Sequence, residues 1–470
     1  MRKTKIICTV GPACCDEKTL AEMCQAGMNV ARLNFSHGTH EQHGEMIRTI
    51  KKVRESLRLP IAIMLDTKGP EYRIGSFKSQ SITLEDGAPF TFTVEDVPGD
   101  ESRVSVSYKN MAAEMKRGDI IKVSDGLLIF EVVDTTKTEV RCRTLVGGEM
   151  RSRKSMSFPD KVLKQAYLSD VDRSDILFGI ENDIDFLACS FVSCKQDLLD
   201  VKKFLSENGG DNIDVIAKIE NRSGVENIEE ICEACDGIMV ARGDLGVEIP
   251  FEELPAIQKQ LIRECRLLGK RVITATEMLE SMIYNVRPTR AEISDVANAV
   301  FDGTSAVMLS GETAAGKYPV LTVQTMVKII ENAESTITYA NRFLSTEFKI
   351  KNTVDAISHA TCNMAIDIHA GVIAVCSLSG ATARMVSRFR CPADILGLTT
   401  DEKTWRKLAL SWGVTPARCD FFNSTDVLFY TAKKIAIETF GLHKGDRLVV
   451  TGGMTNGSSG NTNMIKVEKV

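Results

Sequence analysis

The sequence lacks any apolar run long enough to cross a bilayer, and it carries no excess of positive charge. A membrane-spanning helix needs about 20 apolar residues in succession, so we expect no membrane partner. The formal net charge is -5, which argues against a nucleic acid as the main partner. The start is basic and then apolar but turns at once at Gly11 and Pro12, so we interpret it as a first strand and not as a signal peptide.

The chain has 14 cysteines but few of them stand at the spacing of zinc ligands. Cys232 and Cys235 form a C-x-x-C pair, and no second pair stands at ligand spacing. A zinc or redox pair is one interpretation, but the surrounding run IEEICEACD favours two small residues of a helix. Disulfide frameworks belong to small secreted domains, and this chain is neither small nor marked by a signal peptide. We therefore expect free cysteines in a reducing compartment, the cytoplasm.

The order of apolar runs predicts the fold. A chain of 470 residues is too long for one core. Runs rich in Val, Ile and Leu alternate with helical patterns, which is typical of strands buried on both faces of a parallel sheet. Eight such units close a TIM barrel. The eight runs are Lys5–Val10, Asn29–Phe35, Ile61–Thr67, Asp185–Phe191, Asp214–Glu220, Gly237–Arg242, Arg271–Thr276 and Ser305–Gly311.

Two further domains accompany this barrel. Residues 76–150 alternate polar and apolar side chains between Gly-Asp, Asp-Gly and Gly-Gly turns, which predicts an inserted antiparallel β domain. After about residue 341 a second α/β rhythm begins. We therefore predict an α/β fold, a (β/α)8 TIM barrel with an inserted antiparallel β domain and a C-terminal α/β domain. The predicted bounds are 1–68 and 169–342 for the barrel, 69–168 for the insertion and 343–470 for the C-terminal domain.

Charged residues stand where two buried-type strands end. Lys218 and Glu220 end one run, and Arg242 and Asp244 end the next. Burying such groups unpaired is costly, whereas two carboxylates on neighbouring strand ends suit Mg²⁺ and a lysine beside them can neutralise developing negative charge. A simple salt bridge between Lys218 and Glu220 is the alternative.

The other strand ends add polar groups at the same rim, because the carboxyl ends of barrel strands form one face. Asn34, Ser36, Asp66 and Thr67 offer oxygens for a weakly held monovalent cation, and Arg32 and Arg73 can bind phosphate. Metal ligands, several cations and no evident nucleophile favour phosphoryl transfer. Glu277 and Glu312 are interpreted as supporting groups or plain rim charges, and Thr289 with Glu292 as a helix capping box.

Seven segments in this order resemble the pyruvate kinase family, and the resemblance extends over essentially the whole chain. They read KTKIICTVGP, MNVARLNFSHG, LDTKGPE, AKIENRSGV, GIMVARGDLGVEI, RPTRAE and VMLSGETAAGKYP. The resemblance implies transfer of the phosphoryl group of phosphoenolpyruvate to ADP, giving pyruvate and ATP in the last step of glycolysis.

The resemblance also implies the role of each site residue. It makes Lys218, Thr276 and Arg32 catalytic, and Gly243 and Asp244 join them in binding substrate. Glu220 and Asp244 would hold Mg²⁺, and Asn34, Ser36, Asp66 and Thr67 would hold K⁺. The residues implied to bind nucleotide are Asn34, His37, Arg73 and Lys154. Glu71 matches the glutamate of K⁺-dependent members, so we expect K⁺ dependence. A lysine at this position would instead have supplied the positive charge of the cation internally.

A few positions depart from the family pattern. Ser193 and Cys194 stand where an arginine is common, Glu277 replaces a glutamine, and Val286 replaces a proline. The surroundings of Lys154, residues 153–160, also differ. None of these changes removes Lys218 or a Mg²⁺ ligand.

The C-terminal domain offers a candidate effector site. Ser377, Ser379, Gly380 and Thr382 lead into a helix N-terminus, which favours phosphate; an ordinary helix cap is the alternative. The family places a sugar-phosphate effector here, with residues 451–463 as the opposite wall. Fructose 1,6-bisphosphate, AMP and a sugar monophosphate all remain open, and the family implies a homotetramer.

Two other functions are compatible with parts of this pattern. A Mg²⁺-dependent barrel lyase acting on a pyruvate enolate would share the metal carboxylates but would need neither ADP nor a lid. A catalytically inactive metabolite sensor would act through the C-terminal domain, but it would have no need for an intact Lys218, Glu220 and Asp244.

Overall fold

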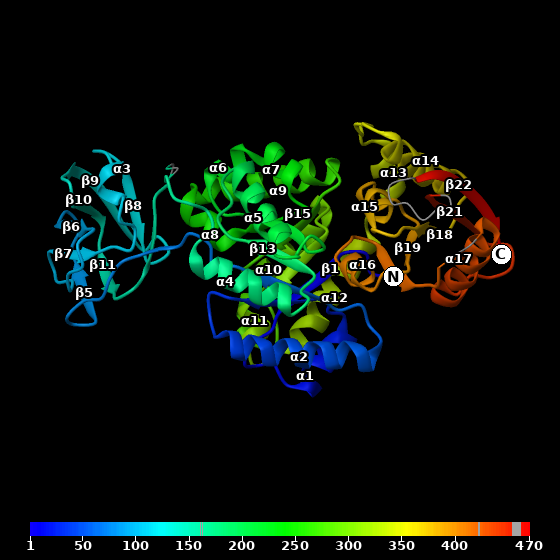
Figure 1. Cartoon of the computed structure of the whole chain (residues 1–470), viewed down its shortest axis with the longest axis horizontal. Coiled ribbons are helices and arrows are strands. Elements are labelled where there is room, and N and C mark those ends of the chain that lie inside the picture. The colour runs from blue at the N-terminus through cyan, green and yellow to red at the C-terminus, as the bar shows by residue number, and fades with distance from the viewer. Residues whose placement is uncertain (160, 162, 422–423, 454–461) are drawn as a thin grey trace.

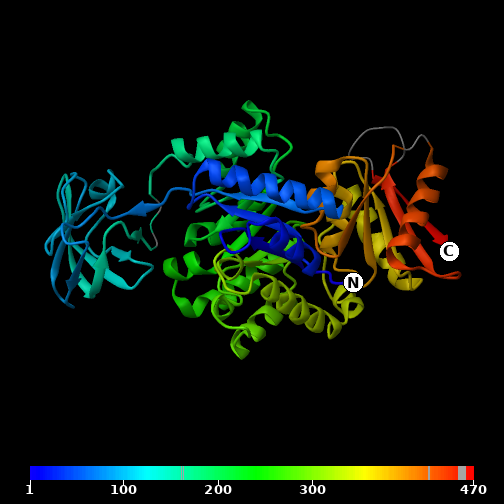
Figure 2. The same ribbon diagram turned by 90° about the horizontal axis from the view of Figure 1, so that it is seen from below.

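The computed structural model describes residues 1–159, 161, 163–421, 424–453 and 462–470. The molecule is elongated, with the inserted domain at one end, the barrel in the middle and the C-terminal domain at the other end (Figure 1). The view from below shows the same order, with the N-terminus lying beside the C-terminal domain (Figure 2). Within the described residues no helix is both long and apolar enough to cross a membrane.

The predicted barrel is confirmed. Eight parallel strands close into a ring in the order β1-β17-β16-β15-β14-β13-β3-β2. Nearly every residue of these strands is buried, because side chains fill the interior and helices cover the outside. The strands are β1 (Lys5–Thr9), β2 (Val30–Asn34), β3 (Ala62–Asp66), β13 (Phe186–Cys189), β14 (Asp214–Ile219), β15 (Gly237–Ala241), β16 (Arg271–Ala275) and β17 (Ala306–Leu309).

Helices cover the barrel, and α1, α2, α4, α6 and α10 begin at side-chain caps. The predicted capping box at Thr289 and Glu292 is confirmed at the start of α10. Cys232 lies in α7 as predicted, whereas Cys235 is the extended C-cap residue that follows this helix. The helices are α1 (Glu17–Ala26), α2 (His40–Leu57), α4 (Asp170–Glu181), α5 (Lys195–Glu207), α6 (Arg222–Glu226), α7 (Ile228–Ala234), α8 (Arg242–Glu248), η1 (Phe251–Glu253), α9 (Leu254–Leu267), η2 (Glu280–Ile283), α10 (Arg290–Asp302), α11 (Gly311–Ala314) and α12 (Pro319–Ser335).

The inserted domain follows β3 and has its own apolar core, which includes Phe90, Phe92 and Phe130. Its main sheet has the order β4-β12-β8-β9-β10-β6-β7, and β11 pairs with β5. The pairing is antiparallel, as predicted, except between β6 and β7. The elements are β4 (Tyr72–Arg73), β5 (Ser81–Leu84), β6 (Pro89–Thr93), β7 (Arg103–Ser105), α3 (Met111–Glu114), β8 (Ile120–Val123), β9 (Leu128–Thr135), β10 (Glu139–Val146), β11 (Gly148–Arg151) and β12 (Ser155–Ser157).

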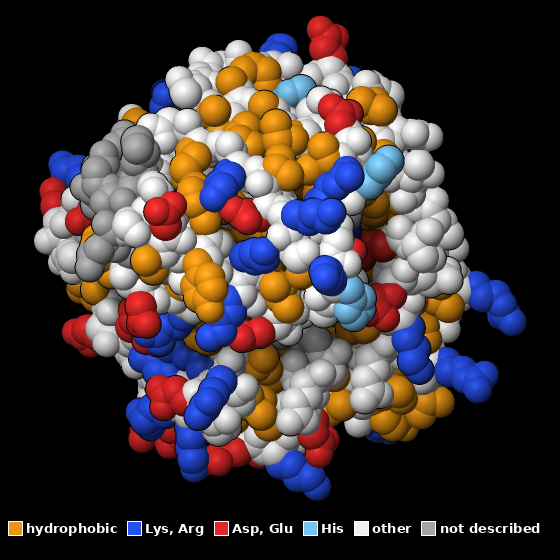
Figure 3. Space-filling view, turned by 90° about the vertical axis from the view of Figure 1, so that its right-hand side faces the viewer, with side chains coloured by type: hydrophobic (Ala, Val, Ile, Leu, Met, Phe, Trp, Pro, Cys, Tyr) orange, Lys and Arg blue, Asp and Glu red, His pale blue; other side chains and the backbone are white. Residues whose placement is uncertain are grey.

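The C-terminal domain is a five-stranded α/β layer with the order β20-β19-β18-β21-β22, in which only β22 is antiparallel to its neighbour. Its outer end face intersperses basic, acidic and apolar side chains (Figure 3). The elements are α13 (Tyr339–Leu344), α14 (Thr353–Asp367), β18 (Val372–Cys376), α15 (Ala381–Arg388), β19 (Asp394–Thr399), α16 (Glu402–Leu408), β20 (Val414–Arg418), α17 (Thr425–Phe440), β21 (Arg447–Gly453) and β22 (Thr462–Lys469).

The C-terminal domain closes the amino-terminal end of the barrel. Leu410, just beyond α16, is fully buried and packs with the apolar residues of the barrel interior. Around it, Asp214 at the start of β14 pairs with Arg271 and Lys407, each at 2.7 Å. Arg406 of α16 pairs with Asp185 at 2.7 Å. The carboxyl ends of the strands are therefore left for the inserted domain at the opposite end of the barrel.

Candidate active site

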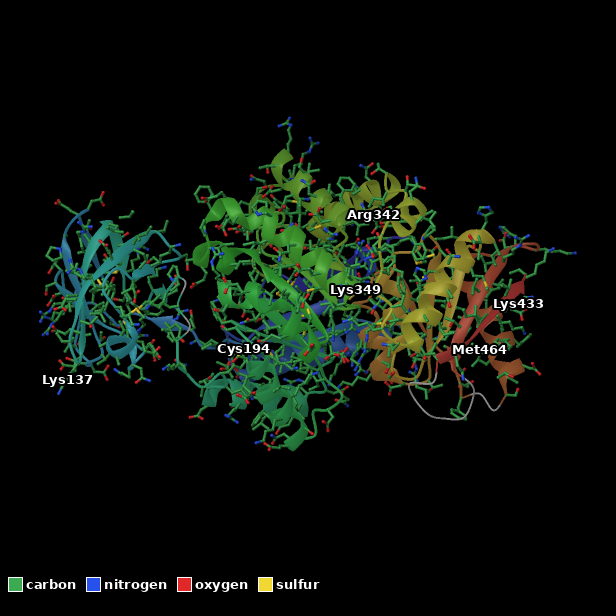
Figure 4. All side chains as sticks on the ribbon, turned by 90° about the horizontal axis from the view of Figure 1, so that it is seen from above. Lys137, Cys194, Arg342, Lys349, Lys433 and Met464 are labelled. Atoms are coloured by element: carbon green, nitrogen blue, oxygen red, sulfur yellow. The ribbon has the colours of Figure 1, made fainter. Side chains whose placement is uncertain are left out.

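A cleft of about 530 Å³ lies between the inserted domain and the carboxyl ends of the barrel strands. Cys194 marks the barrel side nearest the inserted domain (Figure 4). Lys122, on the inserted domain, donates a hydrogen bond to the carbonyl oxygen of Val247 in α8, so the two domains touch at the rim. The charged residues lining the cleft are Glu71, Arg73, Lys122, Asp125, Lys154, Lys161, Asp197, Asp244 and Glu248.

Lys218 is a buried ammonium group surrounded by oxygen atoms. Its Nζ lies 2.9 Å from Oε1 of Glu220 and 3.1 Å from Oδ1 of Asp66. It also donates to Oγ of Ser190 at 2.7 Å. Asp66 in turn accepts from Nε of Arg32 at 2.7 Å. The strand ends of β2, β3, β13 and β14 thus form one charged cluster, as the sequence predicted for Arg32, Asp66, Lys218 and Glu220.

The cluster fixes the charge of its members. Burial disfavours the ammonium of Lys218, but Asp66 and Glu220 outweigh that effect and raise the pKa of Lys218 above its ordinary value. Burial likewise disfavours ionised Asp66, yet Arg32 and Lys218 lower its pKa. Both groups therefore remain charged at neutral pH.

Glu220 and Asp244 form a pair of carboxylates of the kind that binds a divalent metal. Oε2 of Glu220 accepts from the backbone N–H of Phe191 at 2.6 Å. Oε1 is buried and has no directed hydrogen bond in the described part of the chain, although Lys218 lies beside it. Burial raises the pKa of Glu220 to about 8, Lys218 opposes that shift, and Asp244 adds to it. Two neighbouring carboxylates that resist simultaneous ionisation suit a hard cation that shares its shell with substrate oxygens.

Thr276 occupies a strained position beside the start of α8. Its φ is 65° and that of Glu277 is 53°, a left-handed conformation that is rare for a β-branched residue. Oγ1 of Thr276 accepts from the backbone N–H of Gly243 at 2.9 Å. Arg242 donates to the carbonyl oxygens of Thr276 at 2.5 Å and Glu277 at 3.0 Å. The structure therefore brings Gly243 and Thr276 together, as predicted, and shows how Arg242 holds the turn.

The four residues predicted to hold a monovalent cation lie at the ends of two neighbouring strands. Asn34 and Asp66 stand opposite each other in the register of β2 and β3. Oδ1 of Asn34 accepts from the N–H of Ser36 at 3.1 Å, and Ser36 is exposed. The hydroxyl of Thr67 accepts from the N–H of Ser190 at 3.3 Å. This set of amide, hydroxyl and carboxylate oxygens fits a weakly bound cation.

The residues predicted to bind nucleotide separate into two groups. Arg73 in β4 and Lys154 before β12 line the cleft from the inserted domain, and Arg73 pairs with Glu71. Asn34 and His37 stand at the end of β2 and just beyond it, and His37 is exposed. The carbonyl oxygen of His37 accepts from His43. His37 is outside the residues that line the cleft.

Sequence reasoning missed several residues of this site. Ser190 links Lys218 to the carbonyl oxygen of Thr67, to which it donates at 2.6 Å. Ser190 directly follows the fourth barrel strand, β13, so the rule used at the other strand ends would have found it. Asp295 on α10 holds Nη1 of Arg242 at 2.5 Å, and no sequence signal marks it. Glu312, by contrast, is interpreted from the sequence as a supporting group or a rim charge, and it is buried and accepts from the N–H groups of Leu279 and Ser310, as a supporting group would.

The predicted effector residues surround the start of α15. Gly380 is the N-cap of α15, with φ 73°, and as a glycine it offers the helix only its backbone. Thr382 is buried and its hydroxyl lies 2.6 Å from that of Thr462. The N–H of Ser377 donates to the carbonyl oxygen of Leu398 at 2.9 Å. Of the predicted opposite wall, residues 454–461 lie outside the described residues.

Comparisons with known proteins agree with this geometry. The family model described as pyruvate kinase, barrel domain, matches residues 1–323, and that described as pyruvate kinase, alpha/beta domain, matches residues 355–468. The chain belongs to the pyruvate kinase family. A pyruvate kinase of Clostridium acetobutylicum is 46% identical over the full length of both chains. One from Staphylococcus epidermidis is 45% identical over all of this chain and 81% of its own length.

A solved structure gives the same result for the fold. A pyruvate kinase from Cryptosporidium parvum superimposes with a TM-score of 0.95 and 36% identity, covering 100% of this chain and 96% of its own. Pyruvate kinases are phosphotransferases that act on phosphoenolpyruvate and ADP and generally need a divalent metal and a monovalent cation.

Proposed function

We propose that this chain transfers the phosphoryl group of phosphoenolpyruvate to ADP, with Mg²⁺ at Glu220 and Asp244 and K⁺ at Asn34, Ser36, Asp66 and Thr67. The observation that carries the proposal is the buried ammonium of Lys218, 2.9 Å from Glu220 and 3.1 Å from Asp66, beside a cleft lined by Asp244. A permanently charged group there stabilises anionic charge as it develops, and it is preorganised by its neighbours.

The side chains around the cleft divide the work of phosphoryl transfer. Lys218 and Arg32 supply fixed positive charge to the transferring phosphoryl group and to the enolate left behind. Arg73 and Lys154 are on the inserted domain, from which they can bind the phosphates of ADP. A divalent cation at Glu220 and Asp244 would add a further positive charge shared with substrate oxygens. Positioning and electrostatics supply most of the catalysis in such a reaction.

The turn at Thr276 serves the second half of the reaction. When phosphoryl transfer breaks the bond between phosphorus and the enol oxygen, an enolate remains, and a proton must reach its methylene carbon to give pyruvate. Thr276 Oγ1 is fixed by the N–H of Gly243 and donates to the carbonyl oxygen of Ala275 at 2.7 Å. We assign Thr276 to delivery of that proton and the backbone of Gly243 and Asp244 to the substrate carboxylate.

The remaining features concern regulation and assembly. Ser377, Ser379, Gly380 and Thr382 are assigned to an effector phosphate, which is supported by their place around the N-terminus of α15. The effector would be a sugar phosphate or AMP. We also propose a homotetramer in the cytoplasm, and domain bounds of 1–68 with 169–342, 69–168 and 343–470; the last boundary falls inside α13.

One assay tests the proposal against its alternatives. Pyruvate formation from phosphoenolpyruvate is measured with ADP, Mg²⁺ and K⁺ together, and again with each one omitted. The proposal requires a rate that depends on ADP and Mg²⁺ and is stimulated by K⁺. Turnover without ADP would instead indicate the barrel lyase, and no turnover under any condition would indicate the sensor.

A further inference from the structure

A second cavity, of about 980 Å³, lies on the far side of the barrel from the active site. Its walls are α9, the end of α10, α13 and residues 345–349. Phe343 of α13 packs in the core of the C-terminal domain, so the cavity joins the barrel to that domain. Arg342 and Lys349 lie at this junction (Figure 4).

Basic side chains outnumber acidic ones in this cavity. Two of the acidic residues have partners: Asp302 is held by Lys259 at 2.5 Å, and Glu264 accepts from Gln260 at 3.1 Å. The charged residues of the lining are Lys259, Arg263, Arg266, Arg342 and Lys349 on the basic side and Glu264, Asp302 and Glu347 on the acidic side. The lining therefore has a surplus of two positive charges, counted from five basic and three acidic residues.

Arg266 is the unusual member of the cavity. It is 9% exposed, and its Nε has no hydrogen-bond partner among the described residues. Burial lowers the pKa of Arg266 to about 10, and Arg342 and Arg263 add to that effect. Asp302 also has an oxygen without a hydrogen bond, but it forms no ion pair with Arg266 in the described part of the chain. An unpaired buried guanidinium is costly.

The neighbourhood beyond the cavity increases this cost. The fully buried side of the junction contains Arg390, which donates to the carbonyl oxygen of Gly303 at 3.1 Å and to Ser305 at 3.0 Å. Burial lowers the pKa of Arg390, and Arg266 is the next largest cause. Within the described residues neither Arg266 nor Arg390 forms an ion pair, whereas the buried Arg271 at the amino-terminal end of the barrel pairs with Asp214.

The geometry points to an anion-binding site in this cavity, where Arg266, Arg263 and Arg342 bind the phosphate group of a small phosphorylated metabolite. The planar guanidinium offers paired donors that match phosphate oxygens. The cavity volume is far larger than one phosphate and falls in the range of small-molecule sites, roughly 300–1,000 Å³. Occupation would join α9 to α13 and so link the barrel to the C-terminal domain. The site is separate from the catalytic cleft and from the predicted effector residues at the start of α15.

The test uses thermal unfolding of the full-length protein in inorganic phosphate and in sodium chloride at equal ionic strength. The variant is Arg266→Gln, and the matched control is Arg418→Gln, which removes an arginine with an exposed side chain that pairs with Glu402. In chloride we expect Arg266→Gln to melt at or above the wild-type temperature, because an unpaired buried charge is removed. The half-saturating phosphate concentration for stabilisation should rise about tenfold or more in this variant.

Phosphate bound in the catalytic cleft or at the predicted effector residues would stabilise wild type and variant alike. The difference in phosphate response between the two proteins therefore reports on the cavity. Arg342→Gln, at a less buried position, should weaken the response in the same direction and guards against misfolding of the first variant. A second titration with glycerol 3-phosphate separates free phosphate from a phosphate ester: an equal response supports recognition of phosphate alone, and a tighter one supports an organic ligand. If Arg266→Gln and Arg342→Gln both kept the phosphate response of the wild type, as the control Arg418→Gln should, the proposal would be overturned.

Discussion

Arg242 donates a hydrogen bond from Nη2 to the backbone carbonyl oxygen of Thr276 over 2.5 Å. The same guanidinium contacts the carbonyl oxygens of Ala275 and Glu277, and Asp295 holds its other end. Two successive residues in the left-handed region cost on the order of 1–3 kcal/mol each unless neighbouring contacts enforce them. Arg242 is therefore a positioning residue that keeps the Thr276 hydroxyl in place.

Replacement of the Arg242 guanidinium by a single ammonium should impair protonation of the enolate more than phosphoryl transfer. In Arg242→Lys we expect kcat for pyruvate formation to fall by up to about 100-fold, because small misplacements of a reacting group carry costs of that size. The decisive measurement is exchange of the pyruvate methyl protons in deuterated water, which follows proton transfer at carbon without phosphoryl transfer. Asp295→Asn should show the same defect to a smaller extent. Equal exchange rates in the variant and the wild type would refute the positioning role.

Removal of the central ammonium should abolish catalysis without unfolding the protein. In Lys218→Met we expect kcat to fall by at least about 10²–10³-fold, the usual effect of losing a preorganised electrostatic group. Asp66 keeps its ion pair with Arg32 at 2.7 Å, so the strand ends should hold their arrangement. Mn²⁺ binding, followed by electron paramagnetic resonance, should persist because Glu220 and Asp244 are intact.

A matched control separates this effect from a general loss of charge. Lys137 lies at the outer end of the inserted domain, remote from the cleft (Figure 4), and Lys137→Met should leave kcat and Mn²⁺ binding unchanged. Substantial turnover by Lys218→Met would remove Lys218 from the mechanism.

The strand ends were predictable because burial makes their sequence pattern strong. Lys218 and Glu220 follow an apolar run, and the barrel topology then places them beside Asp66 without any knowledge of distances. Contacts that depend on tertiary packing could not be predicted in this way. Asp295 reaches Arg242 from an ordinary helix, and Leu410 fills the base of the barrel from the C-terminal domain. Neither has a local pattern that differs from a helix surface or a buried leucine.

Glu71 should control the response to potassium. Its side chain pairs with Arg73 and lies 3.6 Å from Lys68, and its Oε2 is buried without a hydrogen bond in the described part of the chain. A lysine at this position would supply a fixed positive charge, so in Glu71→Lys we expect activity without K⁺ and little further stimulation by it. The measurement is the rate in potassium chloride relative to tetramethylammonium chloride.

The neutral variant Glu71→Gln is the control for loss of the carboxylate. It provides no positive charge and should still require K⁺. Both variants release Arg73, so any shared change in the KM for ADP belongs to that arginine and not to the cation. A K⁺ requirement that persists undiminished in Glu71→Lys would contradict the assignment of Glu71.

Asp214 should make the junction between the barrel and the C-terminal domain sensitive to acid. Burial opposes its ionisation, but Arg271, Arg384 and Lys407 outweigh burial and hold the pKa of Asp214 well below its ordinary value. An acid with a lowered folded pKa stabilises the folded state above its unfolded pKa of about 3.9, and that contribution is lost as the pH falls through the folded value. Asp214→Asn leaves the buried Arg271 without a carboxylate partner, which costs about 3–5 kcal/mol.

Thermal unfolding across a pH series checks this prediction. The melting temperature of Asp214→Asn should lie well below that of the wild type at pH 7, and the gap should narrow as the pH falls below about 4. Glu17→Gln, which breaks the exposed pair with Lys52, should change the melting temperature little at any pH, because exposed pairs contribute about 0–1 kcal/mol. A gap that stays constant down to acid pH would mean that the Asp214 carboxylate does not stabilise the junction through its charge, and that the loss in the variant comes from packing alone.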